Sequence, residues 1–377
     1  MSWGELKHQR STDNNPLIGL TVSAWWRMLR ASGFRISLVY WRRAVMLTGA
    51  AFINSHFKRK ERVHDSAIRS TPLSAPLFIL GHWRSGTTHL HNLLALHDSR
   101  FAAPTTYQAL APSTFLTTED EAKQTYADRM PATRPMDNMP LTFDTPQEDE
   151  FALCALTTLS PYLALAFPRR EAHFERYLTF SGVAESEIRE WKETFQWFCR
   201  KLSYKHGPAR RLVLKSPAHT ARIRLLLEMF PDASFIHIHR HPYEVFRSFR
   251  HYHDTAAWFT YLQRPDRSRV EESIIRGYRR MHDAYHEQRE LIPAGRLCEV
   301  RFEDLEKDAV GTVGGIYETL GLSGFDEFLP TLEAQVKQRD GYRKNRFEPL
   351  ELRLRDRLAR EWRREFETWG YDPDAVR

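Results

Sequence analysis

Short apolar runs recur through the middle of the chain, and helical stretches separate them. The first run, Leu77–Leu80, is wholly apolar, follows a proline and stops at a glycine. Such a run is typical of a strand that is buried on both faces of a parallel sheet. Three further runs, at 211–215, 234–240 and 297–302, have similar length and character. The pattern therefore predicts four short strands.

A segment with helical character follows each predicted strand. These segments are 86–97, 218–230, a stretch that begins at Pro242, and one that ends near Gly321. Pro217 suits the first turn of the second segment, where its missing N–H is not needed. The repetition of strand and helix predicts an α/β fold with a parallel sheet, flanked by helices, that binds ligands at the carboxyl ends of its strands.

Two further features flank this α/β region. Residues 1–70 are predicted to form a basic, aromatic-rich helical arm, so we divide the chain into this arm and an α/β domain at 71–377. Near the other end, apolar residues recur every four positions and predict one face of a C-terminal helix. They are Leu354, Leu358, Trp362 and Phe366.

The composition is that of a folded protein. The chain has 377 residues, of which 42% are hydrophobic and 27% are charged with both signs mixed, which argues against disorder. No uncharged apolar span reaches the ~18–20 residues that cross a membrane, and the N-terminus has no secretion signal. The cysteines, Cys154, Cys199 and Cys298, are odd in number and lack zinc-ligand spacing. We therefore expect a protein of the reducing cytoplasm.

Charge is concentrated in the arm. The formal net charge is +7, and between Asn14 and Lys60 there is no acidic residue, but there are eight basic residues and three tryptophans. This combination predicts peripheral contact with an anionic membrane. The alternative is that the arm wraps the core, with its tryptophans buried and its arginines paired. No nucleic-acid-binding module accompanies the basic residues, so we expect no nucleic-acid partner.

The segment after the first predicted strand, Gly81-His-Trp-Arg-Ser-Gly-Thr-Thr88, has the glycine spacing of a phosphate-binding loop. Glycines let successive N–H groups point inward, and the N-terminus of the following helix adds partial positive charge, which together form a cradle for an anion. In nucleoside triphosphatases a lysine follows the second glycine, but here Thr87 occupies that position. This argues against hydrolysis of ATP or GTP and leaves a P-loop kinase with a displaced lysine as an alternative.

Residues 77–88 resemble the 5′-phosphosulfate loop of sulfotransferases that use 3′-phosphoadenosine 5′-phosphosulfate (PAPS), in the Arg-Ser-Gly-Thr-Thr form of many bacterial members and of the tyrosylprotein sulfotransferases. The third predicted strand leads into Arg240, Pro242 and Ser248, which resemble the 3′-phosphate motif of the same family. The resemblance covers roughly 70–350. It implies a P-loop-type sheet and transfer of a sulfuryl group from PAPS to a hydroxyl acceptor.

The resemblance also implies the residues that contact PAPS. They are Arg84, Ser85, Gly86, Thr87, Thr88, Arg240 and Ser248, together with Tyr342, Arg343 and Lys344 in a basic segment where the family often has a loop that closes over the cofactor. The third predicted strand lacks the acidic residue that holds Mg²⁺ in P-loop enzymes and ends in an arginine. We therefore expect cationic side chains and no metal.

Sulfuryl transfer needs positioned cations and a general base. Arg84, in the loop, and Lys215, which the family places near the sulfuryl group in a Lys-x-Pro turn, are the predicted catalytic cations. Related bacterial enzymes carry an acidic pair near the acceptor, which makes Glu148 or Asp149 the candidate base, although acidic residues at a helix start also suit the helix dipole. His219 is the competing base, and the sequence does not choose among the three.

The acceptor follows from the arm and from the resemblance. Some bacterial relatives sulfate the terminal hydroxyl of a lipid quinone, and a basic, tryptophan-rich arm suits a membrane surface. We therefore expect an alcohol on an amphiphilic or lipid-like acceptor. A catalytically idle protein that only binds anions or docks on membranes is an alternative function. The sequence indicates neither the identity of the acceptor nor the oligomeric state.

Overall fold

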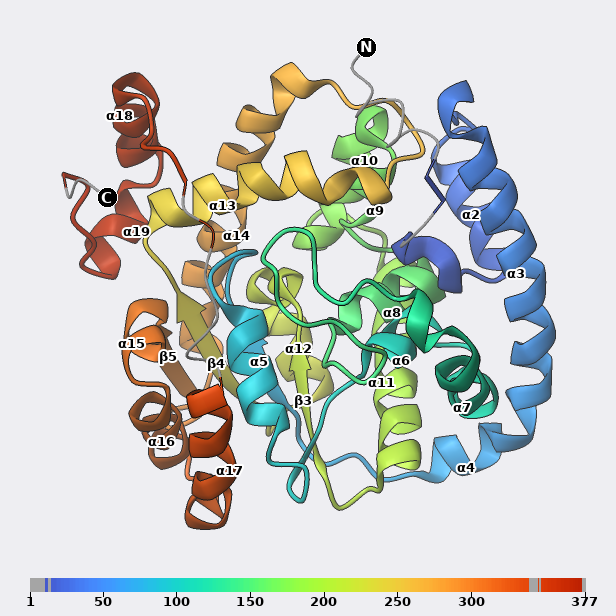
Figure 1. Cartoon of the computed structure of the whole chain (residues 1–377), viewed down its shortest axis with the longest axis horizontal. Helices are drawn as coiled ribbons and strands as arrows, with labels where there is room; N and C mark the ends of the chain where they lie inside the picture. The colour runs from blue at the N-terminus through green and yellow to red at the C-terminus, as the bar shows by residue number, and fades with distance from the viewer. Residues whose placement is uncertain (1–10, 13–14, 339–344, 346, 375–377) are drawn as a thin grey trace.

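The computed structural model describes residues 11–12, 15–338, 345 and 347–374. Its described part contains one central five-stranded sheet in the order β2-β3-β1-β4-β5, and every pairing between neighbours is parallel. The strands are β1 (Leu77–Leu80), β2 (Phe101–Ala102), β3 (Arg211–Lys215), β4 (Ser234–His239) and β5 (Leu297–Arg301). The predicted α/β fold is confirmed, in a molecule that is mostly helical (Figure 1).

The helices fall into groups along the chain. The arm contributes α2 (Val22–Ala31), α3 (Trp41–Glu61) and α4 (Asp65–Ser70). Between β1 and β3 lie α5 (Thr87–Ala95), α6 (Thr106–Leu110), α7 (Phe115–Tyr126), α8 (Asp149–Thr157), α9 (Leu163–Ala166), α10 (Glu171–Glu175) and α11 (Glu185–His206). The rest are α12 (Ile223–Met229), α13 (Pro242–Thr255), α14 (Val270–Gln288), α15 (Phe302–Lys307), α16 (Ala309–Thr319), α17 (Phe325–Gln338), α18 (Leu352–Glu361) and α19 (Arg363–Thr368).

The two faces of the sheet pack into two different cores. Because successive side chains of a strand point to opposite faces, Phe78 and Leu80 of β1 enter the larger core, which contains residues of α8, α11 and the arm. Leu77 and Ile79 enter the smaller core, with residues of α5, α16 and α17. Burial on both faces explains why β1 is apolar without alternation.

The arm is fixed to the larger core on one edge of the molecule, opposite α18 and α19 (Figure 1). Trp25 is buried in that core, but Trp26 and Trp41 are more than half exposed. Arg43 is also buried and donates to the carbonyl of Trp258 at 2.9 Å. A buried ion pair joins Glu61 of α3 to Lys201 of α11. Some residues of the arm therefore wrap the core, as the alternative expected, and others face solvent. The membrane contact stays a prediction.

Three predicted helices differ in detail from the structure. The segment 218–230 begins as a 3₁₀ turn, Pro217–Ala221, and continues as α12. The turn is held because Thr220 Oγ1 accepts from the Gly81 amide at 2.7 Å. The helix predicted to end near Gly321 is two helices, α15 and α16.

The C-terminal helix is likewise two helices, α18 and α19, which meet at Trp362. The predicted apolar face is nevertheless buried, because Leu358, Trp362 and Phe366 pack against Tyr278 of α14 and its neighbours. The Trp362 indole donates to the carbonyl of Ile275 at 3.2 Å, which fixes the break against α14. The very short strand β2 was not predicted. Among the described helices, none is both long enough and apolar enough to span a membrane.

Candidate active site

The loop between β1 and α5 is shaped by two glycines that no other residue could replace. Gly81 has φ 141°, and a Cβ there would lie 2.4 Å from the carbonyl oxygen of Ile238. Gly86 has φ 101°, and a Cβ there would lie 2.2 Å from the ring of Phe302. The chain can therefore curl tightly at the end of the strand and enter α5 at Thr87, whose N-terminal amides have no carbonyl of the helix to bind.

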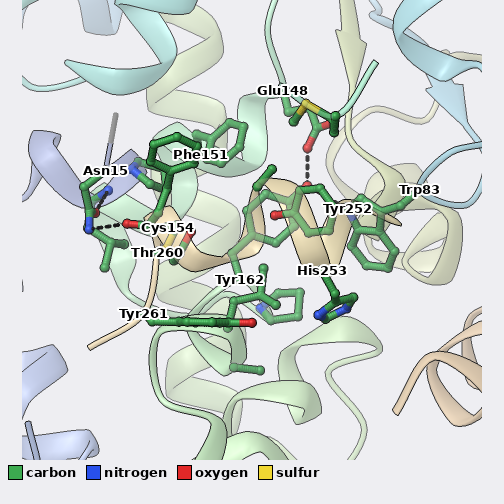
Figure 2. A pocket seen from close by; sticks show the side chains of 18 of the residues that line it. Asn15, Trp83, Glu148, Phe151, Cys154, Tyr162, Tyr252, His253, Thr260 and Tyr261 are labelled. Atoms are coloured by element: carbon green, nitrogen blue, oxygen red, sulfur yellow. Dashed lines mark hydrogen bonds between the residues drawn. The ribbon is translucent and has the colours of Figure 1, made fainter. Parts of the chain in front are cut away.

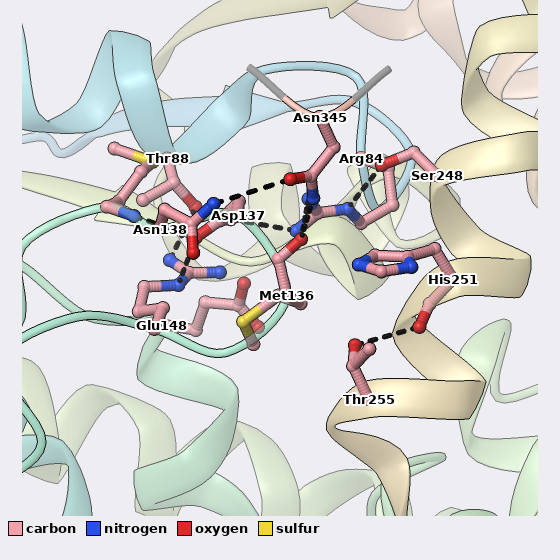
Figure 3. A network of polar contacts seen from close by, with 12 residues as sticks. Arg84, Thr88, Met136, Asp137, Asn138, Glu148, Ser248, His251, Thr255 and Asn345 are labelled. Atoms are coloured by element: carbon pink, nitrogen blue, oxygen red, sulfur yellow. Dashed lines mark hydrogen bonds and ion pairs between the residues drawn. The ribbon is translucent and has the colours of Figure 1, made fainter. Parts of the chain in front are cut away.

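Arg84 connects this loop to two other elements (Figure 3). Its Nε donates to Ser248 Oγ of α13 at 3.0 Å, and its guanidinium forms an ion pair with Asp137 at 2.9 Å. Its backbone carbonyl accepts from Arg240, at the end of β4, at 3.3 Å. Three residues predicted to contact PAPS, Arg84, Arg240 and Ser248, are thus brought together.

Of the other predicted loop residues, Ser85 points into the protein, whereas Thr87 and Thr88 point toward a cavity. Ser85 is buried and its hydroxyl donates to the carbonyl of His82 at 2.8 Å, so this side chain holds the loop in shape. Thr87 and Thr88 line a cavity. Thr88 Oγ1 accepts from Lys215 and from Arg134, each at 3.3 Å.

Glu148 is the centre of the polar end of that cavity. Its Oε1 lies 2.7 Å from Lys215 Nζ, and its Oε2 accepts from the hydroxyl of Tyr162. Lys215 closes β3 and is fully buried, and this burial lowers the pKa of its ammonium although Glu148 acts in the opposite direction. Burial and the neighbouring Glu148 raise the pKa of Tyr162 well above its usual value. At neutral pH, Tyr162 is therefore a hydrogen-bond donor to the carboxylate.

The two other candidate bases are paired with each other. His219 Nε2 lies 2.5 Å from Asp149 Oδ2, and both side chains are completely buried. Burial alone would raise the pKa of Asp149, but contact with His219 outweighs it and holds the pKa below its usual value. Neither residue lines the cavity. The third acid, Glu150, is buried in an ion pair with Arg222. Of 148–150, only Glu148 faces the cavity.

The cavity has a volume of about 1170 Å³. Arg84, Thr88 and Glu148 line its polar end, and the remaining wall is mainly apolar and aromatic, with Trp83, Phe151, Tyr162, Leu165, Phe249 and Tyr252 among its residues. Figure 2 shows Glu148 on one side of this cavity and Tyr261 on the opposite side. The wall also includes Asn15, Pro16, Leu17 and Ile18 of the arm, which the sequence analysis did not connect with the site.

Arg134, Asp137 and Tyr162 are site residues that the sequence analysis missed. Arg134 contacts Thr88 and also Asp137, at 3.3 Å, so the segment before α8 carries a further cation to the loop. This segment has no periodicity and no motif, and no signal in the sequence could have singled out its residues. Asn345 donates to the carbonyl of Met136 at 3.0 Å. The predicted contacts Tyr342, Arg343 and Lys344 lie outside the described residues.

The side chains around the loop fit an anionic cofactor. Four cationic side chains, Arg84, Arg134, Lys215 and Arg240, lie at or next to the loop, and the N-terminus of α5 adds unpaired amides. Arg84 already holds one carboxylate, that of Asp137, which shows that an anionic group fits at this point. Within the described residues, no cluster of three or more His, Cys, Asp or Glu side chains could hold a metal ion.

Comparisons with known proteins agree with this site. The model of a family described as "Sulfotransferase family" matches 76–327. Omega-hydroxy-beta-dihydromenaquinone-9 sulfotransferase Stf3 of Mycobacterium bovis is 36% identical over 358 residues, which cover 94% of this chain and 91% of the relative, and the Mycobacterium tuberculosis protein of the same name matches equally.

Two solved sulfotransferases share the fold. STF1 from Mycobacterium tuberculosis superposes with a TM-score of 0.64 at 16% identity, covering 89% of this chain and 93% of that one. STF9 from Mycobacterium avium superposes with a TM-score of 0.65 at 18% identity, covering 96% and 98%.

The family match includes the loop, Arg84, Lys215 and the end of β4, and the match to the relative covers 94% of the chain. The family resemblance drawn from two short motifs is thereby confirmed, and the kinase alternative is set aside. The chain belongs to the sulfotransferase family, and the protein is a PAPS-dependent sulfotransferase.

Proposed function

We propose that this enzyme transfers the sulfuryl group of PAPS to the hydroxyl of an amphiphilic, lipid-like alcohol, with Glu148 as the general base. The observation that carries this proposal is the form of the cavity. A small charged end, made by Arg84, Thr88 and Glu148, opens onto a large wall of apolar and aromatic side chains. Buried Lys215 contacts Thr88 and Glu148 from behind this end. Such a site binds an apolar body and directs one polar group to the reacting end.

We assign the role of base to Glu148 because its carboxylate lines the cavity. An acceptor hydroxyl that reaches the polar end of the cavity meets Glu148, whereas Asp149 and His219 are buried in contact with each other. Tyr162 and Lys215 hold the carboxylate in one orientation. When Glu148 takes the proton of the acceptor hydroxyl, its ion pair with Lys215 weakens. The ammonium is then free to stabilise negative charge that develops near Thr88.

The cationic side chains hold the donor. We propose that Arg84, Thr87, Thr88 and the amides at Gly86 bind its phosphosulfate end, with Ser85 shaping the loop. Arg240 and Ser248 bind its 3′-phosphate, and Tyr342, Arg343 and Lys344 are further proposed contacts of PAPS. When bound, PAPS would supply the sulfuryl group. Its leaving group, adenosine 3′,5′-bisphosphate, would keep the electron pair of the broken S–O bond on the 5′-phosphate. We add Arg134 to the donor contacts because it shares Thr88 with Lys215.

No metal enters this proposal, because the negative charge of the donor is balanced by side chains. Arg84, Arg134, Lys215 and Arg240 place four positive charges close to one loop. The carboxylates of Asp137, Glu148 and Glu244 offset part of this charge. Preorganised cations of this kind can supply the electrostatic stabilisation that Mg²⁺ supplies in phosphoryl transfer.

The acceptor is proposed from the cavity and from the relative. A volume of about 1170 Å³ exceeds the roughly 300–1,000 Å³ of most small-molecule sites. The relative that is 36% identical is named for a menaquinone derivative, an isoprenoid quinone. We propose that residues 71–377 carry the transfer chemistry and that the arm, 1–70, completes the acceptor cavity. An acceptor of this kind resides in a membrane. We therefore propose that the enzyme works as a peripheral protein at the cytoplasmic face of that membrane.

The direct experiment supplies both substrates together. Purified protein is incubated with ³⁵S-labelled PAPS and a bacterial lipid extract, and the labelled product is identified by mass spectrometry. We expect one sulfated lipid alcohol with the natural enzyme and none with Glu148→Gln. A protein that binds adenosine 3′,5′-bisphosphate but sulfates no alcohol would instead be the idle anion-binding protein, and preferential labelling of small water-soluble alcohols would contradict the lipid acceptor.

A further inference from the structure

A group of large apolar side chains faces solvent where α2 turns into α3. We call Trp26, Phe34, Leu38, Trp41 and Val45 the hairpin tip. Each is more than half exposed, and Leu38 is 87% exposed. The rings of Trp26 and Phe34 contact each other edge to face with centroids 5.9 Å apart. Leu38, Trp41 and Val45 follow Phe34 within eleven residues of the chain. An exposed apolar patch of this kind marks a surface that meets a partner.

The charges around the hairpin tip are positive. Arg30, Arg35 and Arg42 are exposed between its aromatic residues, and none of them forms an ion pair with any described residue. The sequence has no acidic residue between Asn14 and Lys60, and within α2 only Arg27 is paired, with Glu190. Aromatic side chains flanked by unpaired arginines suit an interface in which apolar groups enter and anionic headgroups surround them.

The hairpin tip also adjoins the wall of the acceptor cavity. The Ser37 amide donates to the carbonyl of Leu262 at 3.0 Å, and the Arg264 amide donates to Ser37 Oγ at 3.1 Å. Arg264 and Pro265 line the cavity, and Arg264 is exposed, so the cavity reaches the surface beside Leu38. Figure 1 shows the segment between α13 and α14 extending toward α2. The opening and the apolar patch are therefore parts of one face.

We infer that the hairpin tip docks on an anionic lipid surface and that the acceptor enters the cavity from the lipid beside Arg264. The occupant is lipid because the patch combines apolar tips, unpaired arginines and continuity with a cavity for an apolar chain, which a water-soluble protein partner would not require. The entry route rests on the proposed function, whereas the docking does not. Exposed Arg267 and Arg269 extend the positive charge past the opening, and one acid, Asp266, precedes them.

Flotation of the full chain with vesicles tests the docking. We use vesicles of phosphatidylcholine alone and vesicles with 30% phosphatidylglycerol, at physiological and at high salt. We expect binding to the anionic vesicles, at least tenfold weaker binding to the neutral ones, and release by salt. The triple variant Phe34→Ser, Leu38→Ser, Trp41→Ser should lose at least tenfold in vesicle binding, and so should Arg30→Gln, Arg35→Gln, Arg42→Gln.

A matched control removes exposed apolar residues elsewhere. Leu291 and Leu352 are exposed and lie outside the hairpin tip, so Leu291→Ser, Leu352→Ser should float as the natural chain does. All variants are checked for an unchanged thermal unfolding midpoint. If the natural chain does not float, or if both triple variants float equally well, the inference is wrong. Sedimentation velocity tests for a dimer. If the natural chain forms a dimer, does not bind vesicles, and becomes monomeric in the triple variants, the patch binds a second copy and the inference is wrong.

Activity separates this inference from the proposed function. Sulfation of a short, water-soluble alcohol should be unchanged in both triple variants, because none of their positions touches the reacting end of the cavity. Sulfation of a vesicle-embedded long-chain alcohol should fall at least tenfold. Equal rates on the embedded alcohol would contradict the entry route. Absence of sulfation with every alcohol, together with intact flotation, would instead contradict the proposed function and leave the docking in place.

Discussion

The ammonium of Lys215 lies 2.7 Å from the carboxylate of Glu148, although 67 residues separate them in the chain. The contact exists because β3 ends at Lys215 and α8 begins immediately after Glu148, and both ends face the loop that follows β1. One oxygen of the Glu148 carboxylate contacts Lys215, which also contacts Thr88. The other oxygen accepts from the buried hydroxyl of Tyr162. This geometry makes the identity of the base testable.

Three substitutions distinguish the candidate bases. We expect Glu148→Gln to lower kcat by about 10²–10⁴-fold, because a general base typically contributes that much, with adenosine 3′,5′-bisphosphate binding retained. Since buried Lys215 loses its ion pair, this variant should also lower the unfolding free energy, so kcat is compared per folded molecule. Asp149→Asn and His219→Gln should instead lower the unfolding free energy by about 1–3 kcal/mol, because each leaves a buried partner unsatisfied. Their turnover per folded molecule should stay within a few-fold of the natural enzyme.

Steady-state kinetics and chemical denaturation check this set together. Exposed Glu121→Gln, on α7, serves as the control for loss of a carboxylate. A large drop in kcat for His219→Gln, with stability unchanged, would transfer the role to the Asp149–His219 pair.

The pH dependence of turnover should report Lys215. Burial lowers the pKa of this ammonium below its ordinary value of 10.5. Since the charged form stabilises the reaction, kcat should fall as the pH rises through that lowered pKa, before an exposed lysine would titrate. Lys215→Arg keeps its charge at these pH values, so its alkaline fall should move upward or vanish. An identical alkaline limb in Lys215→Arg would show that another group titrates.

The assignment of the 3′-phosphate rests on Arg240. We expect Arg240→Ala to weaken binding of adenosine 3′,5′-bisphosphate by about 2 kcal/mol, roughly 30-fold, since a charge-assisted contact is lost. Binding of the analogue without the 3′-phosphate should change little. Isothermal titration with both ligands measures the difference, and exposed Arg250→Ala on α13 is the control. Equal losses for the two ligands would move the 3′-phosphate to other residues.

Selection of the acceptor can be altered through Gly277. This glycine lies inside α14 and lines the cavity, and a Cβ there would meet no atom within 4 Å. Gly277→Leu should therefore keep or raise stability, by about 0.5–1 kcal/mol from helix propensity, while it fills part of the cavity. We expect KM for long-chain alcohols to rise about tenfold with short alcohols unaffected.

The matched control for this change is Gly315→Leu. Gly315 is an exposed helical glycine of α16 that has the same open space and does not line the cavity. It should share the gain in stability without the change in selectivity. If Gly277→Leu leaves the KM values for both chain lengths unchanged, the acceptor does not use this cavity.

Turnover should survive metal chelation. Because Arg84, Arg134, Lys215 and Arg240 can balance the charge of the donor, EDTA should change kcat by less than twofold. Measuring sulfation with and without EDTA, and again after Mg²⁺ addition, checks this expectation. Strict dependence on Mg²⁺ would show that the cationic side chains alone do not suffice.

The local pattern of the sequence was sufficient for four of the five described strands and for the loop. An apolar run between a proline and a glycine specifies a buried strand with few alternatives, so β1, β3, β4 and β5 were predicted within about one residue. The glycine spacing indicated a tightly curled loop, and the structure adds the close contacts with Ile238 and Phe302 that require Gly81 and Gly86. Arg84, Arg240 and Ser248 were singled out by their resemblance to the two short motifs of the family.

Only the tertiary structure decided which acid faces the cavity. Glu148, Asp149 and Glu150 are adjacent, but α8 turns each toward a different partner, namely Lys215, His219 and Arg222. Arg134 and Asp137 lie on an aperiodic segment and reach the loop through contacts that local pattern does not encode. The arm likewise forms part of the cavity wall only because it packs on the core. These outcomes depend on residues far apart in the chain that the fold brings together, and no short window of the sequence contains both partners.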